Sequence, residues 1–261
     1  MRALNIAATG MLAQQLNVEV ISNNIANMNT TGFKRQRAEF QDLLYQDERR
    51  VGSTSSDAGT LVPSGIQLGL GVRTAAVYRM TGQGQIITTE NAFDLAIQGK
   101  GYFQVQMPDG STGYTRAGSF QLSPQGQIVT ASGYTVLPGI TIPSDAVNVT
   151  INTSGQVQVT LAGQVQPQTV GQVQLASFPN EVGLAALGDN LYAETPASGN
   201  PTSGVPGAAG FGTVLQGYLE TSNVDVVQEI TNLIRAQRAY EMNSKVIETS
   251  DQMLQSTTQI K

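Results

Sequence analysis

The sequence contains no cysteine, no histidine and no tryptophan among its 261 residues. The absence of cysteine excludes disulfide bonds and thiol nucleophiles. The absence of histidine excludes histidine-based acid–base catalysis and, together with the lack of cysteine, most zinc and copper sites. We therefore expect a protein that is not an enzyme and that binds no cofactor and no metal.

Charged residues and long apolar runs are also scarce. The chain has 14 lysines and arginines against 19 acidic residues, and its net charge of -5 offers no basic field for nucleic acid or an anionic membrane. No stretch reaches the roughly 20 apolar residues that a membrane-spanning helix needs, so we expect no direct membrane insertion. Residues 1–10 lack the apolar core of a secretory signal, and a cleaved signal peptide is not expected.

One glycine-containing motif invites an enzymatic interpretation. Gly99-Lys100-Gly101 lacks the upstream glycine spacing of a phosphate-binding loop, and Tyr102 stands where that loop needs serine or threonine. A serine hydrolase, in turn, would need a base that this chain cannot supply as histidine. Both enzyme classes are therefore disfavoured.

Both ends of the chain have the periodicity of long amphipathic helices. No glycine or proline follows Gly217, and Ser222 with Asp225 has the spacing of a capping box. Seven-residue spacing of apolar residues is typical of coiled coils. In the C-terminal part, the residues at this spacing are Val226, Leu233, Tyr240, Ile247 and Leu254. In the first thirty residues, two neighbouring columns have this spacing, and they include Leu4, Met11, Val18, Ile21 and Ile25.

We expect the two terminal helices to pair. The first helix should run from about residue 2 or 4 to residue 28, with Gly32 in the left-handed conformation that closes a helix. The C-terminal column is expected to contact the first helix within the subunit. The neighbouring apolar residues are expected to face other subunits, and they are Val227, Ile234, Val246 and Met253.

The free energy gained by burying the apolar side chains of two helices alone is small compared with the entropic cost of ordering about sixty residues. A helical hairpin docked on the rest of the same chain is the simple alternative. The comparison favours helices that reach full burial only among copies of the chain, with ends that become ordered on assembly.

Between the helices, the hydrophobic period switches to two. Short apolar–polar runs between glycine, asparagine and aspartate turns predict strands at residues 86–88, 95–97, 102–106, 147–151 and 173–175. Residues 46–65 are polar and turn-rich and are interpreted as an extended excursion. The prediction is an α+β multi-domain protein. Residues 1–30 and 222–261 form its helical assembly domain, residues 31–65 connect, and residues 66–221 form an all-β domain of short antiparallel strands.

Four parts of the chain resemble motifs of bacterial flagellar rod and hook proteins. They are ISNNIAN (21–27) with TGFK (31–34), DLAIQGKGYF (94–103), YTRAGSF (114–120), and SNVD (222–225) with QRAYEMNSK (237–245). The similarity covers essentially the whole chain. The residues that represent the terminal motifs are Asn23, Asn24, Asn27, Gly32, Phe33, Asn223, Asp225, Gln237, Arg238 and Tyr240.

The resemblance implies a structural subunit of the flagellar rod, and the length and residues 63–72 are most similar to distal rod members. Such a subunit would polymerise through its terminal helices into a helical tube that transmits torque from motor to hook. The implied partners are further copies, proximal rod proteins, the hook protein, the peptidoglycan-ring and outer-membrane-ring proteins, and the flagellar export apparatus. The implied location is the periplasm-spanning rod of the basal body, reached by export without a cleaved signal peptide.

Two alternatives stay open. The first is another axial protein of the same family, either a proximal rod protein or a hook protein. The second, from a different class, is a monomeric β-rich module that binds the cell wall. Sedimentation at rising concentration separates the second alternative, because a module stays monomeric.

Overall fold

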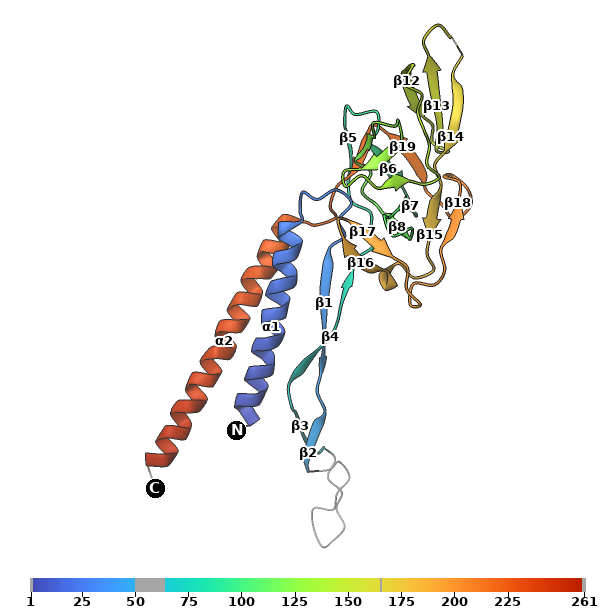
Figure 1. The fold of residues 1–261 in the computed structure, drawn as a ribbon. Coiled ribbons are helices and arrows are strands. Elements are labelled where there is room, and N and C mark those ends of the chain that lie inside the picture. Colours follow the sequence, from blue (N-terminus) through green and yellow to red (C-terminus); the bar gives the residue numbers. More distant parts are fainter. Residues whose placement is uncertain (1, 50–63, 165, 260–261) are drawn as a thin grey trace. The chain divides into compact units, whose positions relative to one another are not determined.

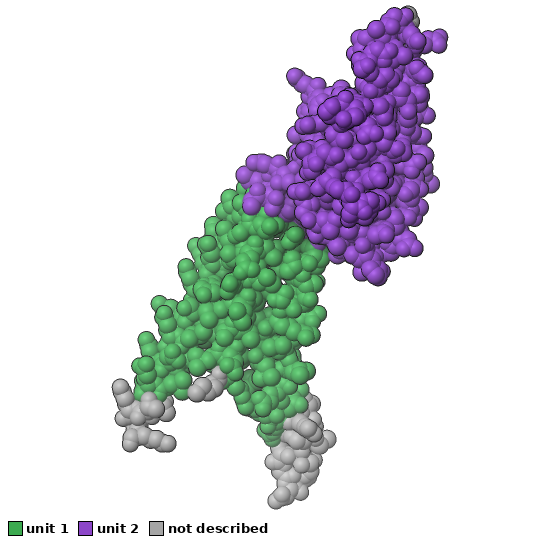
Figure 2. All heavy atoms as spheres, viewed as in Figure 1, with its two compact units in different colours: residues 1–25, 36–78, 225–261 green, residues 26–35, 79–224 purple. Residues whose placement is uncertain are grey.

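The computed structural model describes residues 2–49, 64–164 and 166–259, and the chain divides into two compact units. Unit 1 comprises residues 1–25, 36–78 and 225–261, and unit 2 comprises residues 26–35 and 79–224, coloured separately in Figure 2. Much of the predicted polar excursion, residues 50–63, lies outside the described residues. The predicted three-part division at residues 30, 65 and 221 stays a prediction.

Unit 1 is built on two long helices that lie side by side, α1 (Arg2–Ala26) and α2 (Val226–Gln259) (Figure 1). The helix cap differs from the prediction, because Asp225 rather than Ser222 closes the first turn of α2. The Asp225 carboxylate accepts hydrogen bonds from the backbone N–H groups of Val227 and Gln228 at 3.0 and 3.2 Å. Among the described residues, no helix is long and apolar enough to cross a membrane.

Two strand pairs complete unit 1. The first pair joins β1 (Gln36–Asp42) to β4 (Val72–Arg79), and the second joins β2 (Tyr45–Arg49) to β3 (Ile66–Gly69) in antiparallel register. The Val72 N–H group donates to the Thr9 hydroxyl of α1 at 3.3 Å. Gly71 precedes it with a φ of 125°, and an added Cβ there would lie 2.3 Å from the same hydroxyl. Only glycine therefore permits this approach of the strand to the helix.

Unit 2 consists of short antiparallel strands. Its largest sheet has nine strands, in the order β16-β17-β8-β7-β11-β10-β9, with β15 pairing both β7 and β18. The strands of this sheet are β7 (Tyr102–Gln106), β8 (Thr112–Thr115), β9 (Phe120–Leu122), β10 (Ile128–Thr130), β11 (Thr135–Val136), β15 (Leu175–Ser177), β16 (Ala185–Gly188), β17 (Leu191–Ala193) and β18 (Thr202–Gly204). A 3₁₀ turn, η1 (Glu181–Gly183), precedes β16.

Three smaller sheets complete the unit. One has the order β12-β13-β14, and the others are the pairs β19–β6 and β20–β5. Their strands are β5 (Ile86–Thr88), β6 (Leu95–Gln98), β12 (Ala146–Ile151), β13 (Gln156–Leu161), β14 (Gln168–Gln172), β19 (Thr213–Gln216) and β20 (Tyr218–Glu220). The predicted strands coincide with β5, β6, β7 and β12 within a residue, whereas the one predicted at 173–175 begins only at Leu175.

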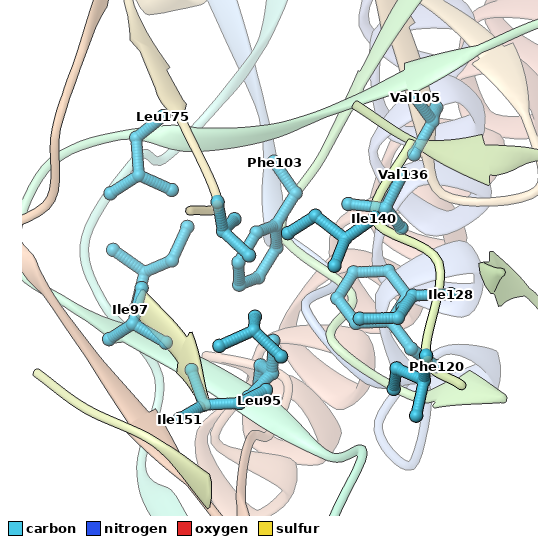
Figure 3. Close-up of a cluster of buried hydrophobic side chains, with 14 of the residues drawn as sticks. Leu95, Ile97, Phe103, Val105, Phe120, Ile128, Val136, Ile140, Ile151 and Leu175 are labelled. Atoms are coloured by element: carbon cyan, nitrogen blue, oxygen red, sulfur yellow. The ribbon is translucent and has the colours of Figure 1, made fainter. Parts of the chain in front are cut away.

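The core of unit 2 follows from strand alternation. On β7, Phe103 and Val105 are completely buried, and the Phe103 ring meets the Phe120 ring edge-on with 5.1 Å between centroids. Figure 3 shows these side chains converging with those of β6, β10 and β15. The fold class is therefore confirmed: the two ends of the chain form paired helices, and the sequence between them forms short antiparallel strands.

Candidate assembly surface

The seam between α1 and α2 is formed by small and polar residues. On α2, Glu229, Ala236 and Ser250 are buried, and they share a seven-residue column with Asn243. A Cβ added to Gly10 of α1 would lie 2.8 Å from the Asn243 side-chain nitrogen. Because small side chains let two backbones approach, the buried column contains these residues rather than the large apolar ones.

The large apolar residues of the predicted columns flank this seam. On α1, Ile21 is buried, whereas Leu4, Met11, Val18 and Ile25 are half-buried. On α2, Val226, Leu233 and Ile247 are half-buried, and Tyr240 and Leu254 are 44% and 41% exposed. The seven-residue period is present, but the most buried column lies three residues further along the helix than the predicted one. Whether the predicted residues form an assembly interface stays a prediction.

A groove runs between the two helices on this flank. It has a volume of about 540 Å³, and we call it the helix groove; its lining residues are Gln15, Val18, Glu19, Gln237, Tyr240 and Glu241. Val18 and Tyr240 belong to the predicted columns, and Gln237 belongs to the C-terminal motif. The groove is apolar in its Val18 side chain and Tyr240 ring and acidic at Glu19 and Glu241. It thus combines an apolar surface with negative charge.

Large apolar side chains on the rest of α2 are exposed. Val227 is 76% exposed, Met242 64% and Met253 63%, and Ile230, Ile234 and Val246 are each close to half exposed. Helical spacing distributes these residues around much of the outer face of α2. An exposed apolar face of this extent marks an interaction surface.

Asn24, a residue of the N-terminal motif, fastens three elements of unit 1. Its side-chain amide donates to the Gln36 carbonyl at 2.8 Å and to the Glu229 carboxylate at 3.1 Å. Its amide oxygen accepts from the Gln36 N–H group at 2.8 Å. Asn24 is 1% exposed, and it joins the end of α1 to the start of β1 and to the first turns of α2. The motif asparagine therefore positions the helix pair.

A buried charge cluster performs a similar task in unit 2. The Glu220 carboxylate lies 2.6 Å from the Lys34 ammonium and 3.0 Å from the Arg116 guanidinium, and all three side chains are almost completely buried. Glu220 also accepts the Gly84 N–H group at 3.0 Å. Burial lowers the pKa of Lys34 below its ordinary value of 10.5, and the charge of Glu220 opposes this shift.

The cluster gathers the three chain segments through which unit 2 continues into unit 1. Lys34 lies in the segment 26–35, Gly84 follows the segment that leaves β4, and Glu220 precedes the segment that enters α2. We call this arrangement the base clamp of unit 2. Arg116 completes it by donating to the Gly99 and Gly101 carbonyls at 2.9 and 2.6 Å.

Asn223 crosslinks the same three segments. Its side-chain oxygen accepts the Arg35 N–H group at 2.6 Å, and its amide donates to the Met80 and Gly82 carbonyls, both at 2.9 Å. Its own N–H group donates to the Phe33 carbonyl at 3.4 Å. These bonds hold residues 223 and 224 outside the helix, which explains why α2 begins only after Asp225.

Gly32 has the predicted left-handed backbone, but α1 already ends at Ala26, so Gly32 does not close that helix. It has a φ of 69°, its N–H group donates to the Glu220 carbonyl at 2.8 Å, and an added Cβ would lie 2.8 Å from the Ala117 nitrogen. Asn27 accepts a side-chain hydrogen bond from Thr30, and the side chains of Asn23 and Arg238 lie at the surface. The motif residues thus divide into positioning residues and exposed residues.

Sequence reasoning missed Glu220, Lys34, Arg116 and Glu229 as functional residues. A signal was available for two of them, because Lys34 lies in the TGFK motif and Arg116 in the YTRAGSF motif, where charged residues stand among apolar ones. Among the described residues, no group of three or more acidic side chains is arranged to hold a metal ion.

The chain combines a β-rich unit, held by the base clamp, with a helix pair whose apolar columns are half exposed. This combination is typical of structural subunits that assemble with other copies. Three family descriptions match the chain: "Flagella basal body rod protein" at residues 4–34, "Flagellar hook protein FlgE/F/G D1 domain" at 96–159, and "Flagellar basal body rod FlgEFG protein C-terminal" at 215–260.

Curated relatives extend the match over the whole chain. The flagellar basal-body rod protein FlgG of Caulobacter vibrioides is 65% identical over 100% of both chains. The FlgG proteins of Agrobacterium fabrum and of Buchnera aphidicola subsp. Schizaphis graminum are 56% and 53% identical, over 97% and 99% of both chains. The chain therefore belongs to the family of flagellar basal-body rod proteins. This confirms the resemblance and the predicted role as a structural subunit of the flagellar distal rod.

Proposed function

We propose that this chain polymerises through α1 and α2 into the helical tube of the distal rod, which transmits torque from motor to hook. The single observation that supports the proposal is the exposure of large apolar side chains on α2, led by Val227 and Met242. Each such side chain contributes roughly 1.5–3 kcal/mol when it is fully buried, so several of them covered by neighbouring copies would stabilise a polymer substantially.

The remaining features agree with a purely structural role. We propose that the chain has no enzymatic activity and needs no cofactor. We also propose that residues 1–30 and 222–261 act as the assembly domain, with the strands of residues 66–221 outside it. In the assembled rod, its partners are copies of itself, the proximal rod proteins, the hook protein and the two ring proteins. Its route is the flagellar export apparatus without a cleaved signal peptide, and its location is the periplasm-spanning part of the basal body.

A deletion strain tests this proposal. Basal bodies isolated from cells that lack the protein should have short rods without hooks in electron micrographs, and the wild-type chain should restore both. Full-length rods without hooks would instead identify a hook protein. Unchanged basal bodies would overturn the proposed function altogether.

Point variants then test the helical surface. Val227→Asp and Ile234→Asp add charges to exposed positions of α2, so the free chain should keep its fold while rod assembly fails. Gln228→Asp is the matched control, since Gln228 is an exposed polar residue of the same helix. Assembly of both apolar variants at the wild-type level would contradict the role of α2.

A further inference from the structure

The two exposed sides of α2 differ in their chemistry. The first side faces the helix groove, where the exposed carboxylates of Glu19 and Glu241 accompany Val18 and Tyr240. Glu19 accepts a hydrogen bond from Gln15 at 3.2 Å. Within the residues that the structure describes, neither carboxylate belongs to an ion pair. The groove is therefore an open, anionic and partly apolar surface.

The second side of α2 is cationic and rich in methionine. Because an α-helix turns about 100° per residue, positions 235, 242, 246 and 253 share one face. That face lies well over 90° around the helix from Glu241 and Tyr240. We call it the Arg235 flank, and its residues, all exposed, are Arg235, Met242, Val246 and Met253.

The two surfaces complement each other in charge and in apolar character. An arginine fork matches a carboxylate geometrically, and charge-assisted pairs are stronger than neutral hydrogen bonds. Methionine side chains are flexible and fill irregular apolar gaps such as the one beside Tyr240. We propose that the helix groove of one copy receives the Arg235 flank of a second copy, with Arg235 placed between Glu19 and Glu241.

This arrangement rests on the proposed function and determines the symmetry of the contact. Groove and flank are different surfaces of the same chain, so the contact is heterologous: each copy receives one neighbour and inserts into another. Heterologous contacts generate rings or open helical arrays, whereas a self-complementary contact ends at a dimer. A groove-to-flank contact therefore permits growth beyond a dimer. Two identical acidic grooves that faced each other would instead repel.

Cysteine crosslinking in isolated rods tests the contact, because the natural chain contains no cysteine. The double variant Arg235→Cys with Glu241→Cys should form a ladder of trimers and longer species when a mild thiol oxidant is added. Each single variant should stay monomeric on a denaturing gel. Dimers from Glu241→Cys alone, or rods of the double variant without a ladder, would overturn the proposal.

Charge exchange provides an independent readout. Glu241→Arg and Arg235→Glu should each reduce the number of complete rods at least tenfold, and the two changes combined should restore them. Arg73 is the control cation, because it is an exposed arginine of β4 and belongs to neither surface; Arg73→Glu should not rescue Glu241→Arg. Circular dichroism of each purified variant confirms that its helices are formed.

The outcomes separate this inference from the proposed function. If the wild-type chain fails to restore rods in the deletion strain, the proposed function is wrong. If the wild-type chain and both single charge variants all restore rods, the chain is a rod subunit but the groove-to-flank contact is refuted.

Discussion

Removal of the Glu220 carboxylate should destabilise unit 2 strongly. Glu220 is 1% exposed and faces two buried cations, Lys34 and Arg116. Glu220→Ala leaves both cations close together without their counter-charge and removes the acceptor of the Gly84 N–H group. Breaking a buried ion pair by removing one partner costs about 3–5 kcal/mol, and we expect Glu220→Ala to lower the free energy of unfolding by that amount.

Glu220→Gln separates the contribution of charge from that of shape. The glutamine keeps an oxygen that can accept from Gly84 and loses the charge. We therefore expect a smaller loss of about 1.5–3 kcal/mol, the range for a hydrogen bond to a charged group. Because Glu220 raises the pKa of Lys34, either substitution should lower that pKa further. Stability of the Gln variant should then recover as pH rises toward 10.5, since a neutral Lys34 no longer needs a counter-charge.

Urea unfolding provides the assay. Near-ultraviolet circular dichroism follows the fixed packing of the buried tyrosines of unit 2, at positions 102, 114 and 192. The urea midpoint multiplied by the slope gives the free energy of unfolding. Glu90→Ala is the control, because Glu90 is exposed and should change the free energy by no more than about 0.5 kcal/mol. A loss below about 1 kcal/mol for Glu220→Ala would refute the idea that this carboxylate holds the base clamp together.

Three further predictions concern other positions. In urea titrations, Gly32→Ala should destabilise unit 2 by at least about 1 kcal/mol more than Gly110→Ala. Both glycines have a positive φ, but of the two only Gly32 lacks space for a Cβ, and equal losses would contradict this reason. Burial raises the pKa of Tyr102 and Tyr192, so the folded state holds their protons more tightly, and stability present below pH 10 should fall above it. Tyrosinate absorbance corresponding to all eight tyrosines before unfolding begins would argue otherwise. Asn24→Asp should weaken helix pairing by about 1–3 kcal/mol in far-ultraviolet melts, since a carboxylate cannot donate to the Gln36 carbonyl. A protonated carboxyl can donate, so acidification that fails to recover the loss would count against this reason.

The helices could be predicted from the sequence because a seven-residue period of apolar residues is a local signal, which the N-terminal stretch shows in spite of Gly10. The same period could not identify the buried column. That column depends on how closely the helices approach at Gly10, and a backbone distance is not encoded in the spacing of Leu233 and Tyr240. The sequence therefore predicts the pairing of the helices, whereas the most buried column is visible only in the structure.

Strands were predictable for a similar reason, and their order was not. Alternation identified residues 102–106 as a strand with Phe103 and Val105 on one face. That β7 also pairs with β11 and β15 depends on contacts between residues further apart in the chain. The base clamp is the extreme case, because Lys34, Arg116 and Glu220 come from three distant segments and meet only in the folded unit.

The base clamp also bears on how such a subunit can change in size. The chain enters and leaves unit 2 through segments that converge on one carboxylate, so residues 85–219 form a closed excursion whose ends are fixed beside each other. Insertions or deletions that spare Arg116 and its acceptors Gly99 and Gly101 would leave the contacts of Lys34 and Glu220 in place. The base clamp would therefore let strand-rich units of different length be joined to the same helix pair, so that subunit size could change while the helices stay the same.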